Sequence, residues 1–119
     1  EAIAYQSRDV FDIMINESKQ YLKVLSVDGG ASVNNYLMQF QADILNTTIR
    51  VPKVYETTSL GVCYLAGLHV GFFPSIRTIT RIHEYTRTYK PKMAEKERED
   101  KYAGWKKAVR AVLTFSKEE

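Results

Sequence analysis

The sequence has few of the residues that crosslink a chain and little net charge. Its 119 residues include one cysteine, which excludes an internal disulfide framework, so we expect a reducing, cytoplasmic environment. No apolar run reaches about 18 residues, so we expect no membrane span. The 17 Lys and Arg residues exceed the 14 Asp and Glu residues by only +3, which does not indicate a nucleic-acid partner. The length predicts one globular domain at most.

The chain begins inside a predicted helix. Glu1 directly precedes an apolar pattern of helical spacing, without an initiator Met, a signal peptide or a capping residue before it. We therefore expect the sequence to be part of a longer protein.

Apolar residues at intervals of three and four predict five helices. The third is apolar on nearly every side and rich in small residues, so we expect it to be buried against a sheet, with Cys63 in the core. Pro91 ends the fourth helix near Tyr89, and the charged residues 90–101 precede the fifth. The predicted helices cover residues 2–21, 33–45, 59–73 and 76–89, and a closing helix begins near Tyr102.

Two short segments predict strands. Residues 24–27 form a compact β-branched run, and residues 47–51 alternate apolar and polar side chains before Pro52, as a strand near a sheet edge does. With the helix between them, these segments predict a parallel crossover unit of an α/β fold. Two strands leave faces and edges uncovered, so we expect further strands from chain outside this sequence.

The turn between the first strand and the second helix, residues 28–30, is the best candidate binding site. Its glycines would let a ligand approach the backbone, and the amides of a helix start favour an anion such as a phosphate. Ser32 is the expected helix cap, and Asn34 and Asn35 in the first turn of the helix could face the same ligand. From spacing alone, a tight turn that needs glycine for its own geometry explains the pattern better, since the spacing fits neither a dinucleotide motif nor a P-loop.

Other reactive side chains stand alone in the sequence. Asp28 has no second carboxylate near it, so we interpret it as a turn residue and not as a metal ligand or base. His69 and His83 have no partner at metal-ligand spacing. Basic residues beside Tyr85 and Tyr89 raise the question of nucleic-acid binding, but Glu84 and the acidic residues after Met93 dilute them; they are Arg77, Arg81, Arg87, Lys90 and Lys92.

Five segments match the pattern of a known protein family, and they occur in the family's order. They read EAIAYQSRDV (1–10), LSVDGG (25–30), NNYLMQFQADIL (34–45), ETTSLG with YLAG (56–61 and 64–67) and YAGWKKAV (102–109). Together they resemble the C-terminal part of the FGGY carbohydrate kinases, and of the glycerol kinases among them in particular. The resemblance implies an actin-like, ribonuclease H-like ATPase fold, in which two domains close around a cleft. Residues 1–119 would be an incomplete C-terminal, nucleotide-binding domain.

The same resemblance implies a function. The full-length enzyme would use ATP to phosphorylate glycerol to glycerol 3-phosphate, and this chain alone would be inactive, because the family's catalytic aspartate and glycerol-binding residues lie upstream. Gly30 would lie against the nucleotide, Asn34 would contact it, and Gly29 would shape the turn. Mg²⁺ would be bound through ATP and residues outside this chain, so no catalytic or metal-ligating residue is expected here.

The resemblance leaves two alternatives open. The chain could belong to another FGGY kinase that acts on a pentulose or related sugar, or it could be a non-catalytic nucleotide-binding module. For the full-length kinase we expect a cytoplasmic homo-oligomer, a dimer or tetramer, with no membrane or nucleic-acid partner.

Overall fold

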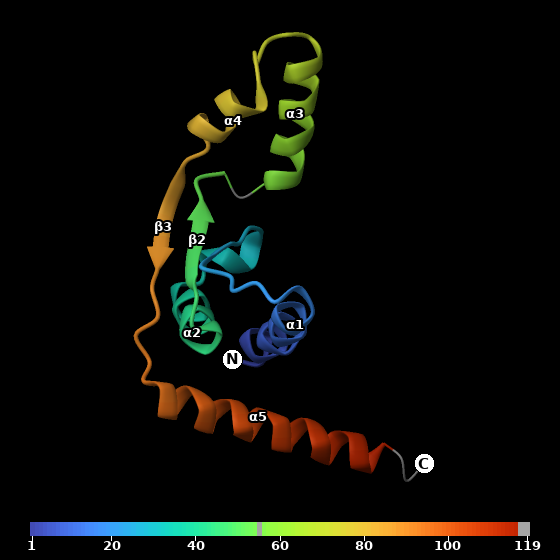
Figure 1. Ribbon diagram of the computed structural model, residues 1–119, viewed down its shortest axis with the longest axis vertical. Coiled ribbons are helices and arrows are strands. Elements are labelled where there is room, and N and C mark those ends of the chain that lie inside the picture. Colours follow the sequence, from blue (N-terminus) through green and yellow to red (C-terminus); the bar gives the residue numbers. More distant parts are fainter. Residues whose placement is uncertain (55, 117–119) are drawn as a thin grey trace.

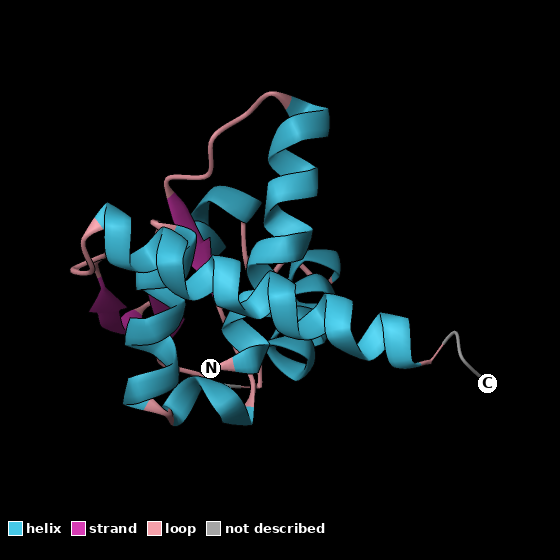
Figure 2. Ribbon diagram, turned by 90° about the horizontal axis from the view of Figure 1, so that it is seen from below, coloured by secondary structure: helices cyan, strands magenta, loops and turns pink. Residues whose placement is uncertain are grey.

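The computed structural model describes residues 1–54 and 56–116 and combines helices with one small sheet (Figure 1). The helices and strands, with a short 3₁₀ helix η1 between the first strand and the second α-helix, are α1 (Ala2–Ser18), β1 (Val24–Ser26), η1 (Gly30–Val33), α2 (Asn35–Leu45), β2 (Thr48–Pro52), α3 (Thr57–His69), α4 (Ile76–Ile82), β3 (Tyr85–Tyr89) and α5 (Glu95–Phe115). Figure 2 shows how much of the chain is helical beside these short strands. None of the described helices is long and apolar enough to cross a bilayer.

The strands form one sheet in the order β1-β2-β3. β1 and β2 are parallel, with Leu25 opposite Ile49, which confirms the predicted crossover through α2. β2 also pairs with the antiparallel β3, where Ile49 lies opposite Tyr89. In the described chain β2 is therefore the middle strand, and its expected place near a sheet edge was wrong.

β3 was not predicted, because residues 85–89 were assigned to the end of a helix. That helix, α4, is capped by Ser75, whose hydroxyl accepts a hydrogen bond from the Thr78 amide at 3.3 Å, but it ends at Ile82. Tyr, Thr and Arg alternate through β3, which suits a strand, and the free edge of β2 supplies the partner. Pairing with a distant strand overrides the local helical pattern.

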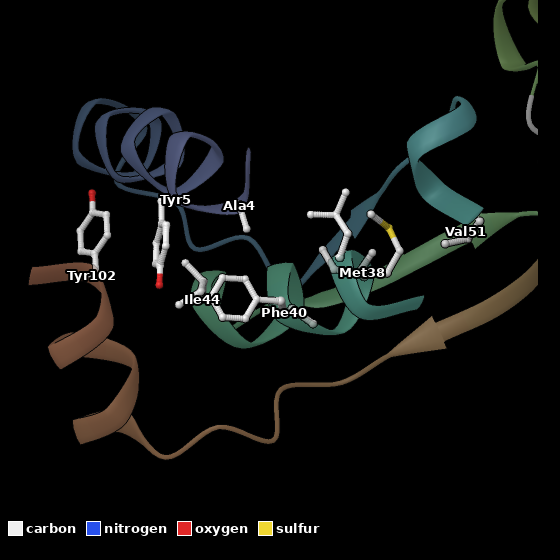
Figure 3. Close-up of a cluster of buried hydrophobic side chains, with 10 residues drawn as sticks. Ala4, Tyr5, Met38, Phe40, Ile44, Val51 and Tyr102 are labelled. Carbon is white, nitrogen blue, oxygen red and sulfur yellow. The ribbon is translucent and has the colours of Figure 1, made fainter. Parts of the chain in front are cut away.

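The hydrophobic core lies between α1, α2 and the sheet (Figure 3). Ile49 and Val51 of β2 are fully buried, while Arg50 between them is exposed, so one face of this strand packs inward. Phe40 and Ile44 of α2 and Ala4 of α1 belong to the same buried cluster. α2 ends at Leu45, the predicted bound, and the following Asn46 has the left-handed conformation.

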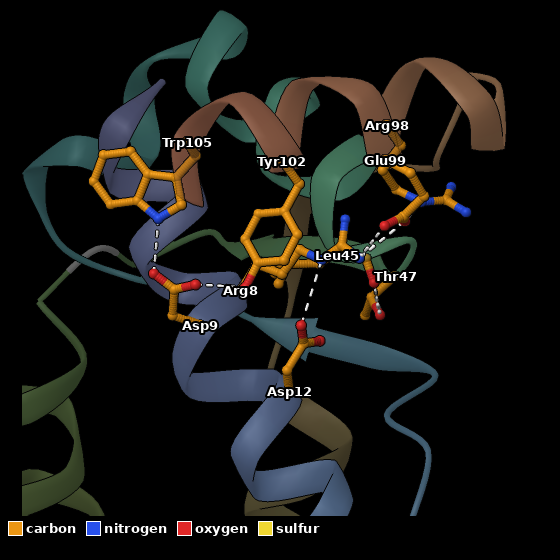
Figure 4. Close-up of polar contacts among 9 residues, drawn as sticks. All are labelled: Arg8, Asp9, Asp12, Leu45, Thr47, Arg98, Glu99, Tyr102 and Trp105. Atoms are coloured by element: carbon orange, nitrogen blue, oxygen red, sulfur yellow. Dashed lines mark hydrogen bonds and ion pairs between the residues drawn. The ribbon is translucent and has the colours of Figure 1, made fainter. Parts of the chain in front are cut away.

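α5 is attached to α1 by specific polar contacts (Figure 4). Asp9 accepts hydrogen bonds from the Tyr102 hydroxyl and from Trp105 Nε1, the latter at 2.8 Å. Arg8 Nη2 pairs with Glu99 at 2.8 Å, and its guanidinium lies 3.9 Å from the centre of the Tyr102 ring. Burial, and then the hydrogen bond to Asp9, raises the pKa of Tyr102 above its ordinary value of 10.0. The neutral phenol is thus the form that holds α5 in place.

α3 and α4 extend away from this core (Figure 1). No residue of α3 is buried, and Cys63 is exposed, so both the expected burial of this helix and the expected core position of Cys63 were wrong for the described chain. Burial requires a surface to pack against. The described residues do not provide one for α3.

Candidate functional site

The turn of residues 28–34 follows β1 at its carboxyl end and leads into α2. The Val27 amide donates to the Arg50 carbonyl at 3.0 Å, so the parallel ladder continues to the residue before Asp28. In open α/β sheets, ligands bind at the carboxyl ends of the strands. The predicted site is therefore in the position where a ligand is expected.

Gly29 and Gly30 have different structural roles in this turn. Gly29 has φ 80° and ψ 174°, a conformation essentially restricted to glycine. Gly30 does not have a positive φ, and a Cβ built on it would meet no described atom within 4 Å. The backbone of the turn requires glycine at position 29, whereas nothing described in this chain requires it at position 30.

Ser32 is buried and stabilises the turn by hydrogen bonds to the Gly29 carbonyl. It is 1% exposed, its hydroxyl donates to the Gly29 carbonyl at 2.7 Å, and its amide donates to the same oxygen at 3.0 Å. Ser32 therefore lies within η1 and does not cap α2, so that prediction was wrong. The 3₁₀ turn continues to Val33, and α2 begins only at Asn35.

Asn34 is the residue that caps α2. Its Oδ1 accepts a hydrogen bond from the Leu37 amide at 3.0 Å, and the residue is exposed. Its Nδ2 donates to no other residue in the described ranges. One side of this amide thus fixes the start of the helix, and the other can donate to a ligand above the turn.

Asp28 and Asn35 are both engaged with neighbouring elements. Asp28 accepts a hydrogen bond from the hydroxyl of Thr57, the first residue of α3. Asn35 Oδ1 accepts from Arg87 Nη1 at 2.6 Å and from the Tyr89 hydroxyl at 2.7 Å, so it is turned to β3. At Gly30, by contrast, an added Cβ would meet no described atom within 4 Å, and Asn34 Nδ2 has no described acceptor.

The contacts of Arg87 and Tyr89 with the turn were missed by the sequence reasoning. Both residues had been considered only as part of a basic and aromatic surface. The signal that could have found them is the alternation of Tyr, Thr and Arg from 85 to 89, which indicates a strand whose side chains alternate in direction.

The isolated histidines do not join the turn. His69 is exposed at the end of α3, and His83 packs edge-on against the Tyr85 ring with centroids 5.0 Å apart. In the ranges 1–54 and 56–116, no three His, Cys, Asp or Glu side chains are grouped to hold a metal ion. Next to His83, Glu84 forms an exposed ion pair with Lys53 at 2.7 Å, which lowers the pKa of Glu84.

Away from the turn, a hollow with both charged and apolar walls lies between α1, α2 and α5. Its volume is about 160 Å³, and Arg8, Arg98, Asp12 and Glu99 contribute to its walls (Figure 4). Arg8 Nη1 is buried there without a described hydrogen-bond partner. Two guanidinium groups face two carboxylates, and the hydrogen bond from Arg8 lowers the pKa of Glu99. The formal charges of these four side chains sum to zero. We therefore interpret the hollow as a junction between helices and not as a site that attracts a charged ligand.

Comparison with known proteins identifies the family of this chain. A family model described as the C-terminal domain of the FGGY family of carbohydrate kinases matches residues 1–70. The chain belongs to the FGGY family of carbohydrate kinases. Its α/β architecture is the C-terminal, actin-like FGGY domain in part, so the expected fold class is confirmed.

The FGGY relatives of this chain include many glycerol kinases. It is 54% identical over 109 residues to the glycerol kinase of Pseudomonas fluorescens, covering 92% of this chain and 22% of the relative. It is 55% identical over 116 residues to that of Treponema denticola, covering 98% and 23%. The chain is thus a homologue of glycerol kinases and spans less than a quarter of their length.

The crystal structure of Plasmodium falciparum glycerol kinase with ADP has a similar fold. It superimposes with a TM-score of 0.83 at 37% sequence identity, covering 93% of this chain and 22% of the other. The arrangement of α1, the β1-α2-β2 unit and the following elements is therefore one that a glycerol kinase adopts.

Proposed function

We propose that this chain is the C-terminal part, residues 1–119, of the nucleotide-binding domain of a glycerol kinase. In the full-length enzyme, the γ-phosphoryl group of ATP is transferred to glycerol to give glycerol 3-phosphate and ADP. The observation that carries this proposal is the open glycine at position 30, in a turn at the carboxyl end of a parallel strand. The similarity to glycerol kinases, one of them solved with ADP, supports the choice of substrate and nucleotide.

The turn is suited to the adenosine end of the nucleotide. Gly29 gives the turn its shape, Gly30 leaves room for a flat ring to lie against the backbone, and Asn34 has an amide Nδ2 that can donate to it. When bound, ATP with Mg²⁺ supplies the phosphoryl group and its charge neutralisation. We place the Mg²⁺ on ATP and on residues outside this chain.

Phosphoryl transfer depends on positioning across a closed cleft, so a chain that holds one side of the nucleotide is insufficient for it. By resemblance, the base that activates glycerol belongs to the upstream part of the kinase. We propose that the 119-residue chain alone is inactive and that the full-length enzyme is a cytoplasmic homo-oligomer, a dimer or tetramer.

Substrate profiling of the full-length kinase tests the assignment. ATP consumption is expected to depend on glycerol and to be absent with the 119-residue chain alone. Consumption that depends on a pentulose and not on glycerol would favour the other FGGY specificity. If the full-length protein is folded but does not consume ATP in the presence of either substrate, the result would support a non-catalytic nucleotide-binding module.

The role of the turn is tested by Gly30→Leu in the full-length kinase. The added side chain would occupy the space proposed for adenosine, so the KM for ATP should rise by about tenfold or more while the KM for glycerol stays unchanged. Gly104→Leu is the matched control, because Gly104 in α5 also has no described atom within 4 Å of an added Cβ. An unchanged KM for ATP in Gly30→Leu would refute the role of this turn.

A further inference from the structure

β3 holds the junction between η1 and α2 through two side chains. Arg87 Nη1 donates to the Val33 carbonyl at 3.3 Å and to Asn35 Oδ1 at 2.6 Å. The Tyr89 hydroxyl donates to the same Asn35 oxygen at 2.7 Å. The sequence separation is more than 50 residues, so these bonds join the turn to a distant part of the chain.

The two residues that receive these bonds flank Asn34. Val33 is the last residue of η1, and Asn35 is the first residue of α2. Fixing the Val33 carbonyl and the Asn35 side chain restricts the backbone on both sides of position 34. Asn34 itself donates nothing to β3 and keeps Nδ2 directed away from the helix cap that its Oδ1 forms.

Tyr89 is well placed to hold the junction because its ring is anchored. In the sheet it lies opposite Ile49, and its ring packs on the edge of the hydrophobic core. Only the hydroxyl group reaches Asn35. Its position is therefore set by the core and by strand pairing, both of which are more rigid than a surface side chain.

We infer that Arg87 and Tyr89 are positioning residues for nucleotide binding: they hold the η1–α2 junction so that Asn34 is presented to the nucleotide. This inference rests on the proposed role of the turn. Neither side chain is proposed to touch the nucleotide, since their bonds go to Val33 and Asn35. Binding would then be coupled to β3, a strand more than 50 residues further along the chain.

Tyr89→Phe in the full-length kinase is the main test, because it removes the hydroxyl and keeps the ring in the core. Loss of one such bond should raise the KM for ATP roughly threefold, with kcat, the KM for glycerol and the melting temperature unchanged. Thr88→Val is the matched control. It removes a hydroxyl from the same strand at a residue that is paired with Arg50, on the opposite side of the sheet from Tyr89.

Arg87 provides the second variant. Arg87→Ala with Tyr89→Phe should raise the KM for ATP by about tenfold, and Arg87→Lys with Tyr89→Phe should recover part of that loss, because a lysine still donates one hydrogen bond. Arg87 makes additional interactions, so the double variants are read against Arg87→Ala alone.

The outcomes separate this inference from the proposed function. A raised KM for ATP with an unchanged KM for glycerol in Tyr89→Phe supports the positioning role. If Gly30→Leu raises the KM for ATP while Tyr89→Phe and the Arg87 variants do not, the positioning role is overturned and the turn keeps its function. If Gly30→Leu is also without effect, the nucleotide site itself is overturned. A parallel rise in both KM values with a lower melting temperature shows a structural role only and overturns the inference.

Discussion

α2 and α3 are both apolar helices that follow a strand, but only α2 is buried. α2 is covered by β2 on one side and by α1 on the other, and its Ile44 is 1% exposed. α3 contains no Asp, Glu, Lys or Arg, yet Leu65 is 69% and Val62 64% exposed. The more uniformly apolar helix is thus the one without cover in the described chain.

The difference shows that apolar composition predicts the need for a covering surface and not where that surface comes from. For α2 the surface lies within this chain. The glycerol kinases to which the chain is similar are more than four times longer than the aligned segment. We expect α3 to be covered by parts of the full-length kinase that lie outside these residues.

The largest expected effect comes from removing a buried side chain of α2. Ile44→Ala should lower the free energy of unfolding of this chain by about 2–5 kcal/mol, because it removes buried methyl groups and leaves a cavity. Leu65→Ala on α3 should change it by less than about 0.5 kcal/mol. Urea unfolding followed by circular dichroism measures both.

The same pair of variants in the full-length kinase reverses part of this comparison. Leu65→Ala should then cost about 2 kcal/mol or more, because the side chain is expected to be buried there. An equally small cost in both proteins would contradict the idea that α3 is covered.

Two glycines with positive φ compare the core with the α3–α4 region. Gly29 precedes η1 and has φ 80°, and Gly71 follows α3 and has φ 75°. Gly29→Ala should cost about 1–3 kcal/mol of global stability, because alanine is strained in that conformation. Gly71→Ala should cost less than about 1 kcal/mol, since the exposed segment can rearrange without disturbing the core. Equal losses in urea unfolding would show that the two regions unfold as one unit.

The contacts that attach α5 to α1 give a third comparison. α3 is joined to the turn through the hydrogen bond of its first residue, Thr57, to Asp28, whereas α5 is joined to α1 through Glu99, Tyr102 and Trp105. Asp9→Ala would leave the Tyr102 hydroxyl and Trp105 Nε1 without their acceptor, which should cost about 1–3 kcal/mol. Asp100→Ala, an exposed aspartate of α5, is the control and should have little effect. If Asp9→Ala and Asp100→Ala lower the melting temperature equally, Asp9 does not have the proposed role of attaching α5 to α1.

The smallest expected effect is a pH dependence of the α1–α5 junction. Arg8 lowers the pKa of Glu99 below its ordinary value of 4.5, so the folded state favours the charged carboxylate. The resulting stabilisation is present above pH 4.5 and is lost as the pH falls through the lowered pKa. It should be below about 1 kcal/mol, because the Glu99 side chain is 49% exposed. Glu99→Gln should flatten the stability profile in this acidic window, and Asp100→Asn should not.

The β1-α2-β2 unit could be predicted because its signals are local. The β-branched run at 24–27, the glycines at 29 and 30, and the helical spacing through Ile44 each identify their own element. β3 could not be predicted in the same way, since residues 85–89 become a strand by pairing with β2, more than 30 residues earlier in the chain.

The candidate turn was predicted in position but not in detail. Ser32 and Asn34 are both good helix caps. Ser32 lies inside the short η1, which leaves Asn34 as the cap of α2, and this 3₁₀ turn has no periodic signal in the sequence. The assignment of adenine nucleotide to Gly30 and Asn34 came from the family resemblance. The structure adds a physical distinction between the two glycines. The backbone conformation of the turn requires glycine at position 29, whereas nothing described in this chain requires it at position 30.

A crystal structure of the full-length kinase with ADP tests the central claim most directly. We expect the adenosine to lie against the Gly30 backbone, within about 4 Å of its Cα, and Asn34 Nδ2 to donate to the nucleotide or to a water bound to it. ADP bound in an ordered site that contacts neither Gly30 nor Asn34 would contradict it.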